Sequence, residues 1–496
     1  MITRRRLSSA VLALPILFAA ACSSSASAPT DATADELNYR STAGQEFALT
    51  TDVTFKVSAA IEAMPAGPEK DQAVLAQSEK IRTTVTTALT AELDRIWPEE
   101  ERISGAAVSI EFRQATATSS DLKPLEGGGF AMTVSTEFAG IKELEKRLPL
   151  KTDADQTFLP LTADLGAGPV ELRVFITPIA RSLNAYPRYL ELFQDGLDIA
   201  VHVGGDHNDP PQDIDHARSI YDDLVASGFK SPVAAFADLK LDSGPLTSSI
   251  KVKGEDVAVR VRIAHVDMST PETRDTLINA FKDSVKNADV VIYDGHAGRS
   301  LDFSGVVLAY KPARAALPAN QFKNIDATDK QQVYLFNGCE TYTGYADKLY
   351  ENPHRKPENT DVITTGNFSA IQPKANQVIS FIHSFIDQRS GAWIPRSWDS
   401  VLGKMNAVGE RSWVHVYGVH GLDDNPKISP LADVSRIGAA CQRNADCGSP
   451  DSRCIATATR RVCGAACADS AGCPAGTACV LPKGRTSADD QQCSPQ

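Results

Sequence analysis

The distribution of cysteines constrains this chain more than any other feature of its sequence. Ten cysteines occur in 496 residues, and eight of them lie between positions 441 and 493. The first four of these are spaced C-x5-C-x6-C-x8-C and the last four C-x5-C-x5-C-x13-C, so the tail repeats itself. Such a Gly- and Pro-rich stretch has too few large apolar residues to fold by burial alone. We therefore expect a disulfide-rich module over residues 441–496.

The number of tail cysteines is even, which predicts four disulfides, but the spacing leaves their pairing open. Zinc is the alternative, and it is disfavoured because the tail has no CxxC pair and no histidine. Small modules of this kind often bind a partner, but no ligand can be named from the sequence. The predicted disulfide residues are Cys441, Cys447, Cys454, Cys463, Cys467, Cys473, Cys479 and Cys493.

The first 22 residues are typical of an export signal. Three arginines at positions 4–6 precede an apolar stretch over 10–18, and the sequence AAAC at 19–22 resembles the lipobox of bacterial lipoproteins. The resemblance implies that Cys22 is acylated and anchors the protein in the bacterial cell envelope, outside the cytoplasm, at the outer membrane. Residues 23–37, rich in Ser, Ala and Thr, read as a flexible tether. Plain secretion is the alternative, and the export route stays open.

The charge of the chain excludes some partners. A formal net charge of −12 disfavours nucleic acid and anionic membrane surfaces, because both require clustered Lys and Arg. Membrane attachment is therefore expected through the lipid on Cys22. The length predicts two or three domains.

A first region, residues 38–190, reads as a small mixed α/β domain without a reactive constellation. By analogy with other multidomain proteins, such a region is often a prodomain or presents a substrate. Its apolar periodicity predicts strands at 47–57, 108–112, 130–138 and 170–176 and a long helix over 69–96.

A second region, residues 191–430, alternates strands with helices, which indicates a mostly parallel sheet with helices on both faces. In such sheets ligands bind beyond the carboxyl ends of the strands. The predicted strands are 197–203, 257–266, 290–293, 333–336, 361–365 and 413–417, and the predicted helices are 214–227, one opening at Thr270-Pro271, and 375–388.

Two of these strands end in chemistry-bearing residues. The sequence DVVIYDGHAG places His296 just after one apolar run, and QVYLFNGCET places Cys339 just after another. If the two strands are neighbours, an imidazole and a thiol meet at one sheet edge, as thiol catalysis requires. Backbone amides near Gly295–Gly298 and at Cys339 would then serve as oxyanion donors, because the small residues Gly295, Ala297, Gly298 and Gly338 let a carbonyl approach the backbone.

The order strand, His, about forty residues, strand, Cys resembles the clan of cysteine peptidases that includes caspases, legumain, gingipains and clostripain. Legumain-like members have a DHG-type turn and a Cys-Glu-Ser turn; here stand D-G-H-A-G at 294–298 and C-E-T at 339–341. Ala297 occupies the place where the family usually has Gly. The likeness covers 198–425 and includes the segment D-H-A-R at 215–218, before a helix that stops at Gly228.

The resemblance implies a caspase-like three-layer α/β/α sandwich that cleaves peptide bonds in a peptide or protein substrate. Cys339 and His296 would form the catalytic dyad, without a metal or organic cofactor. Asp294 and Glu340 are candidates for orienting the dyad. Asp294 is equally explained as a solvated turn residue, and the alternative for Glu340 is that it merely faces solvent. The alternatives are a binding lipoprotein with an inactive caspase fold, and a legumain-like peptide ligase.

Three further readings compete with this site. A lone cysteine such as Cys339 is often buried and inert. His420 also follows a predicted strand and rivals His296 as the base, although a base that precedes the nucleophile matches the clan better. The loop 206–209, with Asp213, Asp215 and His216 nearby, offers metal-ligand side chains, but its spacing favours an ordinary polar loop. A place along the substrate cleft is the other alternative for this loop, because it too lies past a strand end.

Overall fold

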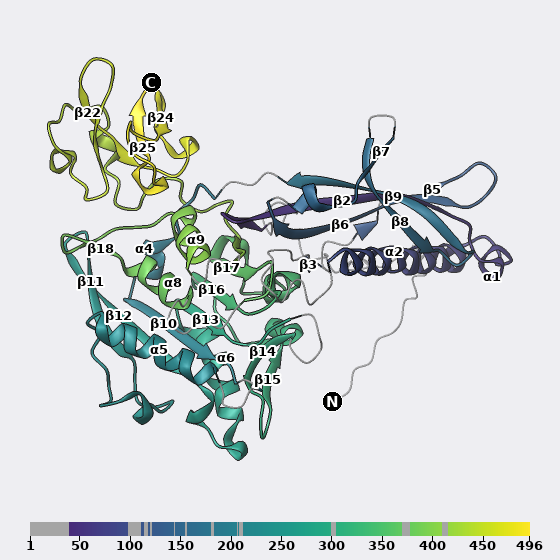
Figure 1. The fold of residues 1–496 in the computed structure, drawn as a ribbon, viewed down its shortest axis with the longest axis horizontal. Coiled ribbons are helices and arrows are strands. Elements are labelled where there is room, and N and C mark those ends of the chain that lie inside the picture. The colour runs from purple at the N-terminus through teal and green to yellow at the C-terminus, as the bar shows by residue number, and fades with distance from the viewer. Residues whose placement is uncertain are drawn as a thin grey trace, which may run out of the picture.

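The computed structural model describes residues 39–97, 111–113, 118–119, 122–142, 144–153, 156–179, 183–205, 207, 212–298, 304–369, 377–408 and 415–496. The predicted signal segment with Cys22 and the tether over 23–37 lie outside this set. The described chain forms an N-terminal sheet with a long helix, a central domain around a mostly parallel sheet, and a cysteine-rich tail packed beside the central domain (Figure 1).

The central sheet has eight described strands in the order β1-β20-β17-β16-β13-β10-β12-β11. Five neighbours, from β17 to β12, run parallel, whereas β20, β1 and β11 are antiparallel to the strands beside them. The strands are β1 (Arg40–Ser41), β10 (Leu197–Val203), β11 (Leu246–Val252), β12 (Glu255–Ala264), β13 (Val290–Asp294), β16 (Gln332–Asn337), β17 (Thr360–Thr365) and β20 (Tyr417–His420).

Helices cover both faces of this sheet, which explains why its inner strands are apolar on both sides. Successive residues of β13, such as Ile292 and Tyr293, belong to two different hydrophobic cores, one on each face of the sheet. The first core lies under α5 (Asp213–Ala226), α8 (Gln377–Ile386) and α9 (Trp398–Ala407), together with the short α4 (Tyr189–Leu192). The second lies under α6 (Asp275–Asn287), α7 (Tyr345–Tyr350) and the hairpin β14 (Gly305–Ala309)–β15 (Ala315–Pro318).

The N-terminal region is a twisted antiparallel sheet with α2 (Pro68–Ile96) along one face (Figure 1). The helix buries one residue per turn against the sheet, including Ile81, Val85 and Leu89, because this spacing keeps them on one face. The strands are β2 (Gly44–Phe55), β3 (Glu111–Phe112), β4 (Thr118–Ser119), β5 (Lys123–Pro124), β6 (Phe130–Ile141), β7 (Lys151–Asp153), β8 (Gln156–Asp164) and β9 (Pro169–Ile179).

The N-terminal region also contributes to the central sheet, which the sequence did not predict. Strand β1 pairs with β20, with Arg40 opposite Val419 and Ser41 opposite Gly418. The Tyr39 hydroxyl donates a hydrogen bond to the Val416 carbonyl. The two sheets are thus joined through residues 39–44, and the predicted boundary near residue 190 does not separate two independent units.

The tail confirms the predicted disulfide module. Within residues 415–496, all of them described, four disulfides join the first cysteine of each half to its third and the second to its fourth. Both half-modules therefore share one pairing pattern, in line with the sequence repeat. The pairs are Cys441–Cys454, Cys447–Cys463, Cys467–Cys479 and Cys473–Cys493, and the strands are β21 (Cys454–Ala456), β22 (Arg461–Cys463), β23 (Ala465–Ala466), β24 (Thr477–Val480) and β25 (Gln492–Pro495).

Some predicted elements differ from those observed. The last strand of the central sheet is β20 at 417–420 rather than 413–417, and 413–414 lie outside the described residues. Strand β11, helix α9 and the small hairpin β18 (Gln388–Arg389)–β19 (Ala392–Trp393) were not predicted. Within the described ranges, every helix is too short or too polar to cross a membrane.

Candidate active site

The carboxyl ends of β10, β13, β16 and β17 meet at one edge of the central sheet, because these strands are parallel neighbours. After β10 the chain adds β12 on one side and β13 on the other, so the strand order reverses between β10 and β13. Such a switch point leaves a crevice between diverging loops, where ligands of α/β sheets bind. His296 follows β13, one of the two strands at this point.

His296 and Cys339 occupy matching positions on adjacent strands. Strands β13 and β16 pair in parallel with Asp294 opposite Asn337, and each of the two residues lies two positions beyond that pair. The condition set by the sequence, that the two strands are neighbours, is met. Both side chains are partly exposed, so neither is sealed in the core.

Glycines let the two turns pack closely. A Cβ atom on Gly338 would lie 2.4 Å from the Ala297 Cβ and 2.8 Å from the Gly295 oxygen, which is closer than real side chains come. The residue before the cysteine therefore packs against both neighbours of His296. A side chain at Gly338 would push the two turns apart, which explains the need for glycine here.

Cys339 sits on a constrained turn. Its Sγ lies 3.7 Å from the carbonyl oxygen of Ser369, on the loop after β17. The next residue, Glu340, has left-handed backbone angles (φ 57°, ψ 31°), and its N–H donates to the Asn367 oxygen at 3.0 Å. Backbone strain of this kind is commonly kept where a side chain must be aimed. Glu340 is 6% exposed, so the reading of Glu340 as a surface residue was wrong.

His296 has an aromatic neighbour in the loop after β10, the loop for which the sequence left open a place beside the substrate cleft. The His207 ring centroid lies 4.7 Å from that of His296 and 5.5 Å from that of Tyr310. The backbone of His296 is fixed by the Tyr293 hydroxyl, which donates to its carbonyl oxygen at 2.6 Å. His207 follows β10, a parallel neighbour of β13, and this position past a strand end is the signal from which the sequence suggested a place beside the cleft.

Asp294 occupies a buried network below the two turns. Its carboxylate lies 2.9 Å from His216 Nδ1 and accepts a hydrogen bond from Asn337 Nδ2 at 2.6 Å. Asn337 in turn accepts from the Tyr417 hydroxyl. One oxygen of Asp294 thus binds the end of β16 and the other contacts His216 on α5, which does not match a direct orienting contact with His296. His216 belongs to this network rather than to a metal loop.

The predicted oxyanion donors are not equivalent. The Gly295 N–H donates to the Asn337 carbonyl at 3.0 Å, so it continues the β-ladder and is not directed at a substrate. The Gly298 N–H interacts with the Tyr345 hydroxyl. Burial raises the pKa of Tyr345, and hydrogen bonds from Gly305 and Gly298 oppose that rise. The role predicted for the Ala297 and Cys339 amides stays a prediction.

The rival base, His420, lies elsewhere. Strand β20 is antiparallel to β17, so its carboxyl end points away from the edge that carries Cys339. His420 is fully buried, and its Nε2 lies 2.9 Å from the Thr364 hydroxyl. Its ring stacks on Tyr342 with centroids 6.0 Å apart. His420 is therefore a core residue.

Among the described residues, metal-ligand side chains cluster only where disulfides form. These clusters are the trios Cys441–Cys447–Cys463 and Cys467–Cys473–Cys479, whose sulfurs are crosslinked. Asp213 is buried at the start of α5. Three residues of the predicted polar loop, Asp206, Asn208 and Asp209, lie outside the described residues.

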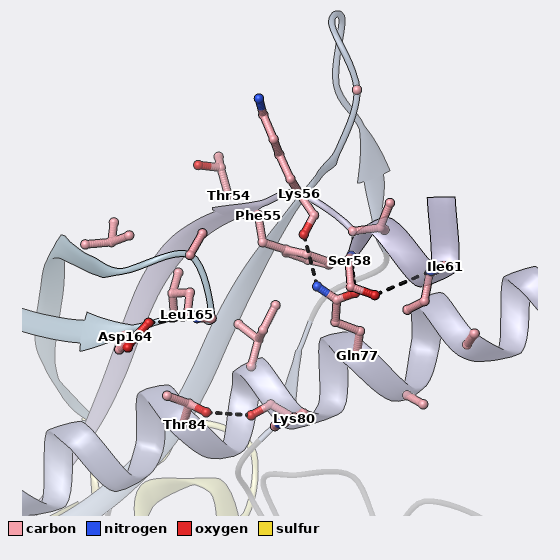
Figure 2. A pocket seen from close by; sticks show the side chains of 18 of the residues that line it. Thr54, Phe55, Lys56, Ser58, Ile61, Gln77, Lys80, Thr84, Asp164 and Leu165 are labelled. Atoms are coloured by element: carbon pink, nitrogen blue, oxygen red, sulfur yellow. Dashed lines mark hydrogen bonds between the residues drawn. The ribbon is translucent and has the colours of Figure 1, made fainter. Parts of the chain in front are cut away.

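A groove of about 1060 Å³ lies in the N-terminal domain, between α2 and the end of β2 (Figure 2). Its walls are mainly apolar or small, and it contains neither cysteine nor histidine. Its acid, Asp164, accepts hydrogen bonds from the Gly166 and Gly168 amides at 2.9 and 3.1 Å, so this carboxylate shapes a loop. The groove offers contact surface but no reactive group.

The reactive residues of the described chain thus gather at one sheet edge, where a thiol and two imidazoles follow three adjacent strands. Comparisons with models of known families, with curated proteins and with solved structures find no match for this chain.

Proposed function

We propose that this protein is an exported, lipid-anchored cysteine peptidase whose central domain has a caspase-like fold. The observation that carries the proposal is the matching position of His296 and Cys339, two residues beyond a paired register position on adjacent parallel strands. The partial exposure of both residues and the switch point beside them support a substrate crevice at this edge.

In the proposed reaction the Cys339 thiolate attacks the carbonyl carbon of the scissile peptide bond. A C–S bond forms, and the carbonyl oxygen takes the negative charge, which the Ala297 and Cys339 N–H groups stabilise. His296 then gives its proton to the leaving amine as the C–N bond breaks. Water hydrolyses the resulting thioester and restores the thiol.

The envelope location belongs to the same proposal. Acylation at Cys22 would tether the mature chain outside the cytoplasm, where the oxidising conditions that four tail disulfides require are available. A thiol that stays outside the disulfides in such a compartment is exposed to oxidation. A chemical task for Cys339 gives a reason for its presence.

A peptide probe that acylates active thiols tests the proposal. We expect labelling of the full chain to vanish in Cys339→Ala and to fall about a hundredfold in His296→Ala. His354→Ala is the matched control, because His354 is an exposed histidine that contacts Asp329 instead. Equal labelling of wild type and both site variants would refute the peptidase and favour a binding lipoprotein.

A second measurement separates hydrolysis from ligation. Product analysis of a cleaved peptide, with and without an added amine acceptor, shows whether water or the amine takes the acyl group from Cys339. We expect hydrolysis products to dominate. Transfer to the amine as the main product would indicate the ligase.

A further inference from the structure

The turn after Cys339 is inserted into the core of the N-terminal domain. Cys339 is followed by the 3-10 helix η7 (Thr341–Thr343), and Tyr342 on η7 packs in the same hydrophobic cluster as residues of β2, β6 and α2. The Tyr342 ring meets Tyr39 edge to face with centroids 5.0 Å apart. Its hydroxyl donates to Glu46 Oε1 on β2 at 2.6 Å. A residue three positions from the thiol thus contacts the other domain.

A second contact holds the next element. Arg113, directly after β3, makes a bidentate ion pair with Asp347 on α7. Its Nη2 lies 2.5 Å from Asp347 Oδ1, and its Nε lies 3.4 Å from Asp347 Oδ2. Its Nη1 lies 3.7 Å from Glu46 and 3.5 Å from Glu137. The Tyr342 and Asp347 contacts flank Gly344, so they hold the segment that follows Cys339 at two points.

The charged groups of this cluster are shielded from water. Arg113 and Glu46 are each 1% exposed, and Asp347 is 6% exposed. Burial alone would lower the pKa of Arg113, but Asp347, Tyr342 and Glu46 outweigh it and raise that pKa above its ordinary value. Burial, reinforced by Glu46, raises the pKa of Tyr342, so its hydroxyl stays protonated and able to donate. Removal of either domain would leave buried charges of the other domain without their partners.

The opposite side of the Cys339 turn is fixed by the sheet. The Thr341 hydroxyl donates to the Phe336 carbonyl at 3.0 Å and contacts the Thr365 hydroxyl at 3.2 Å. The Thr365 hydroxyl in turn donates to the Gly338 carbonyl. The turn is therefore clamped between β17 and the N-terminal domain.

We propose that the N-terminal domain is a permanent positioning unit for Cys339, acting through Glu46 on Tyr342 and through Arg113 on Asp347. This inference rests on the proposed function of the dyad and extends it to residues that touch no substrate. It also opposes the reading of residues 38–190 as a prodomain that is removed, because β1 is part of the central sheet.

The test uses the pH dependence of Cys339 alkylation by iodoacetamide in the full chain, with the modified peptide quantified by mass spectrometry. The thiolate is the reactive form, and a nearby imidazolium favours it. In Glu46→Ala we expect the midpoint of the rate profile to rise by about one pH unit. We also expect kcat for a peptide substrate to fall about tenfold, with KM little changed. Glu46→Gln keeps an acceptor oxygen for Tyr342, so both the midpoint of the alkylation profile and kcat should return close to their wild-type values.

Leu89→Ala is the matched control, because it leaves a cavity under α2 in the same domain while Glu46 and Arg113 keep their side chains. At temperatures where both variants are folded, its alkylation profile should equal that of the wild type. An unchanged profile in Glu46→Ala, or an equal shift in Leu89→Ala, would overturn the inference. If the wild type cleaves no peptide but Glu46→Ala still shifts the profile, positioning stands and the peptidase proposal fails.

Discussion

In the central domain, large apolar side chains on both faces of the sheet are buried under helices, whereas the apolar clusters of the tail consist mainly of cysteines. The two regions meet at Arg396, which pairs with Asp387 of the central domain and with Asp489 of the tail. One region therefore depends on burial and the other on crosslinks.

The comparison bears on where thiol chemistry is available. The tail uses all of its cysteines in disulfides, so it has structure but no thiol. The central domain needs no crosslink among its described residues and can keep Cys339 outside the disulfides. Histidine follows the same division, because all nine histidines lie between residues 202 and 420. Acid–base chemistry near neutral pH is thus confined to the central domain.

Reduction of the tail disulfides should produce the largest difference in stability between the tail and the central domain. Each tail disulfide closes a loop of 12 to 20 residues. Such a loop contributes about 3 kcal/mol, so four together contribute on the order of 10 kcal/mol. We expect a strong reductant to abolish amide-exchange protection in the tail while the central sheet stays protected. A tail that keeps its protection after full reduction would show that burial suffices there.

A cavity in the central domain should have the next largest effect. Phe381 on α8 is fully buried against Phe385, so Phe381→Ala should lower the free energy of unfolding by about 3–5 kcal/mol in urea titrations. Val225→Ala, at a position 40% exposed on α5, is the control and should cost under about 1 kcal/mol. A loss at Phe381 no larger than that of the control would contradict the reliance on burial.

The junction between the regions gives a smaller effect. Arg396→Met leaves Asp489, whose side chain is 10% exposed, without its charged partner. We expect about 2 kcal/mol of lost stability, seen as faster amide exchange around Asp489. Adding Asp489→Asn should recover part of the loss, because the stranded charge is removed. If the stability losses of Arg396→Met and Asp489→Asn simply add in the double variant, the Arg396–Asp489 pair does not hold the tail on the central domain.

The smallest expected effect is that of mild acid on the stability of the central domain. Burial lowers the pKa of His202 from its ordinary 6.5 to about 4, so the unfolded chain binds a proton that the folded chain does not. The contribution of the neutral His202 to the free energy of unfolding is therefore fully present above pH 6.5, and it is lost as the pH drops from 6.5 to 4. At pH 5.5 the loss from this residue is about 1 kcal/mol.

His202→Gln, which can still bond to Ser284, should flatten the dependence of unfolding free energy on pH over that window. His354→Ala, an exposed histidine, should leave the slope as it is. A slope that is the same in wild type and His202→Gln would contradict the neutral, buried state of His202.

Local sequence pattern was enough to predict the strands that carry the site. The apolar runs before His296 and Cys339 match β13 and β16 to within one residue at each end, because strands buried on both faces are apolar throughout. The strand ends fixed the positions of both residues. The adjacency of the two strands was a condition that only the structure could supply.

The supporting contacts could not be predicted, because they join residues far apart in sequence. Tyr342 and Glu46 are separated by 296 positions, and no periodicity links them. Strand β1 has two residues, too few to produce an alternating pattern. The disulfide pairing was open for a different reason, because several connectivities are compatible with the same cysteine spacing.

Strand β1 also bears on the order in which parts of the molecule fold. Its partner, β20, lies more than 370 residues later in the chain. A nascent chain emerges from its amino end, so Arg40 and Ser41 must wait for almost the entire central region before they find their neighbour. Pairings between such distant segments form slowly because their loop-closure entropy comes first. The sheet edge at β1 is thus expected to close late, and a chain truncated before residue 417 should leave that edge open to self-association.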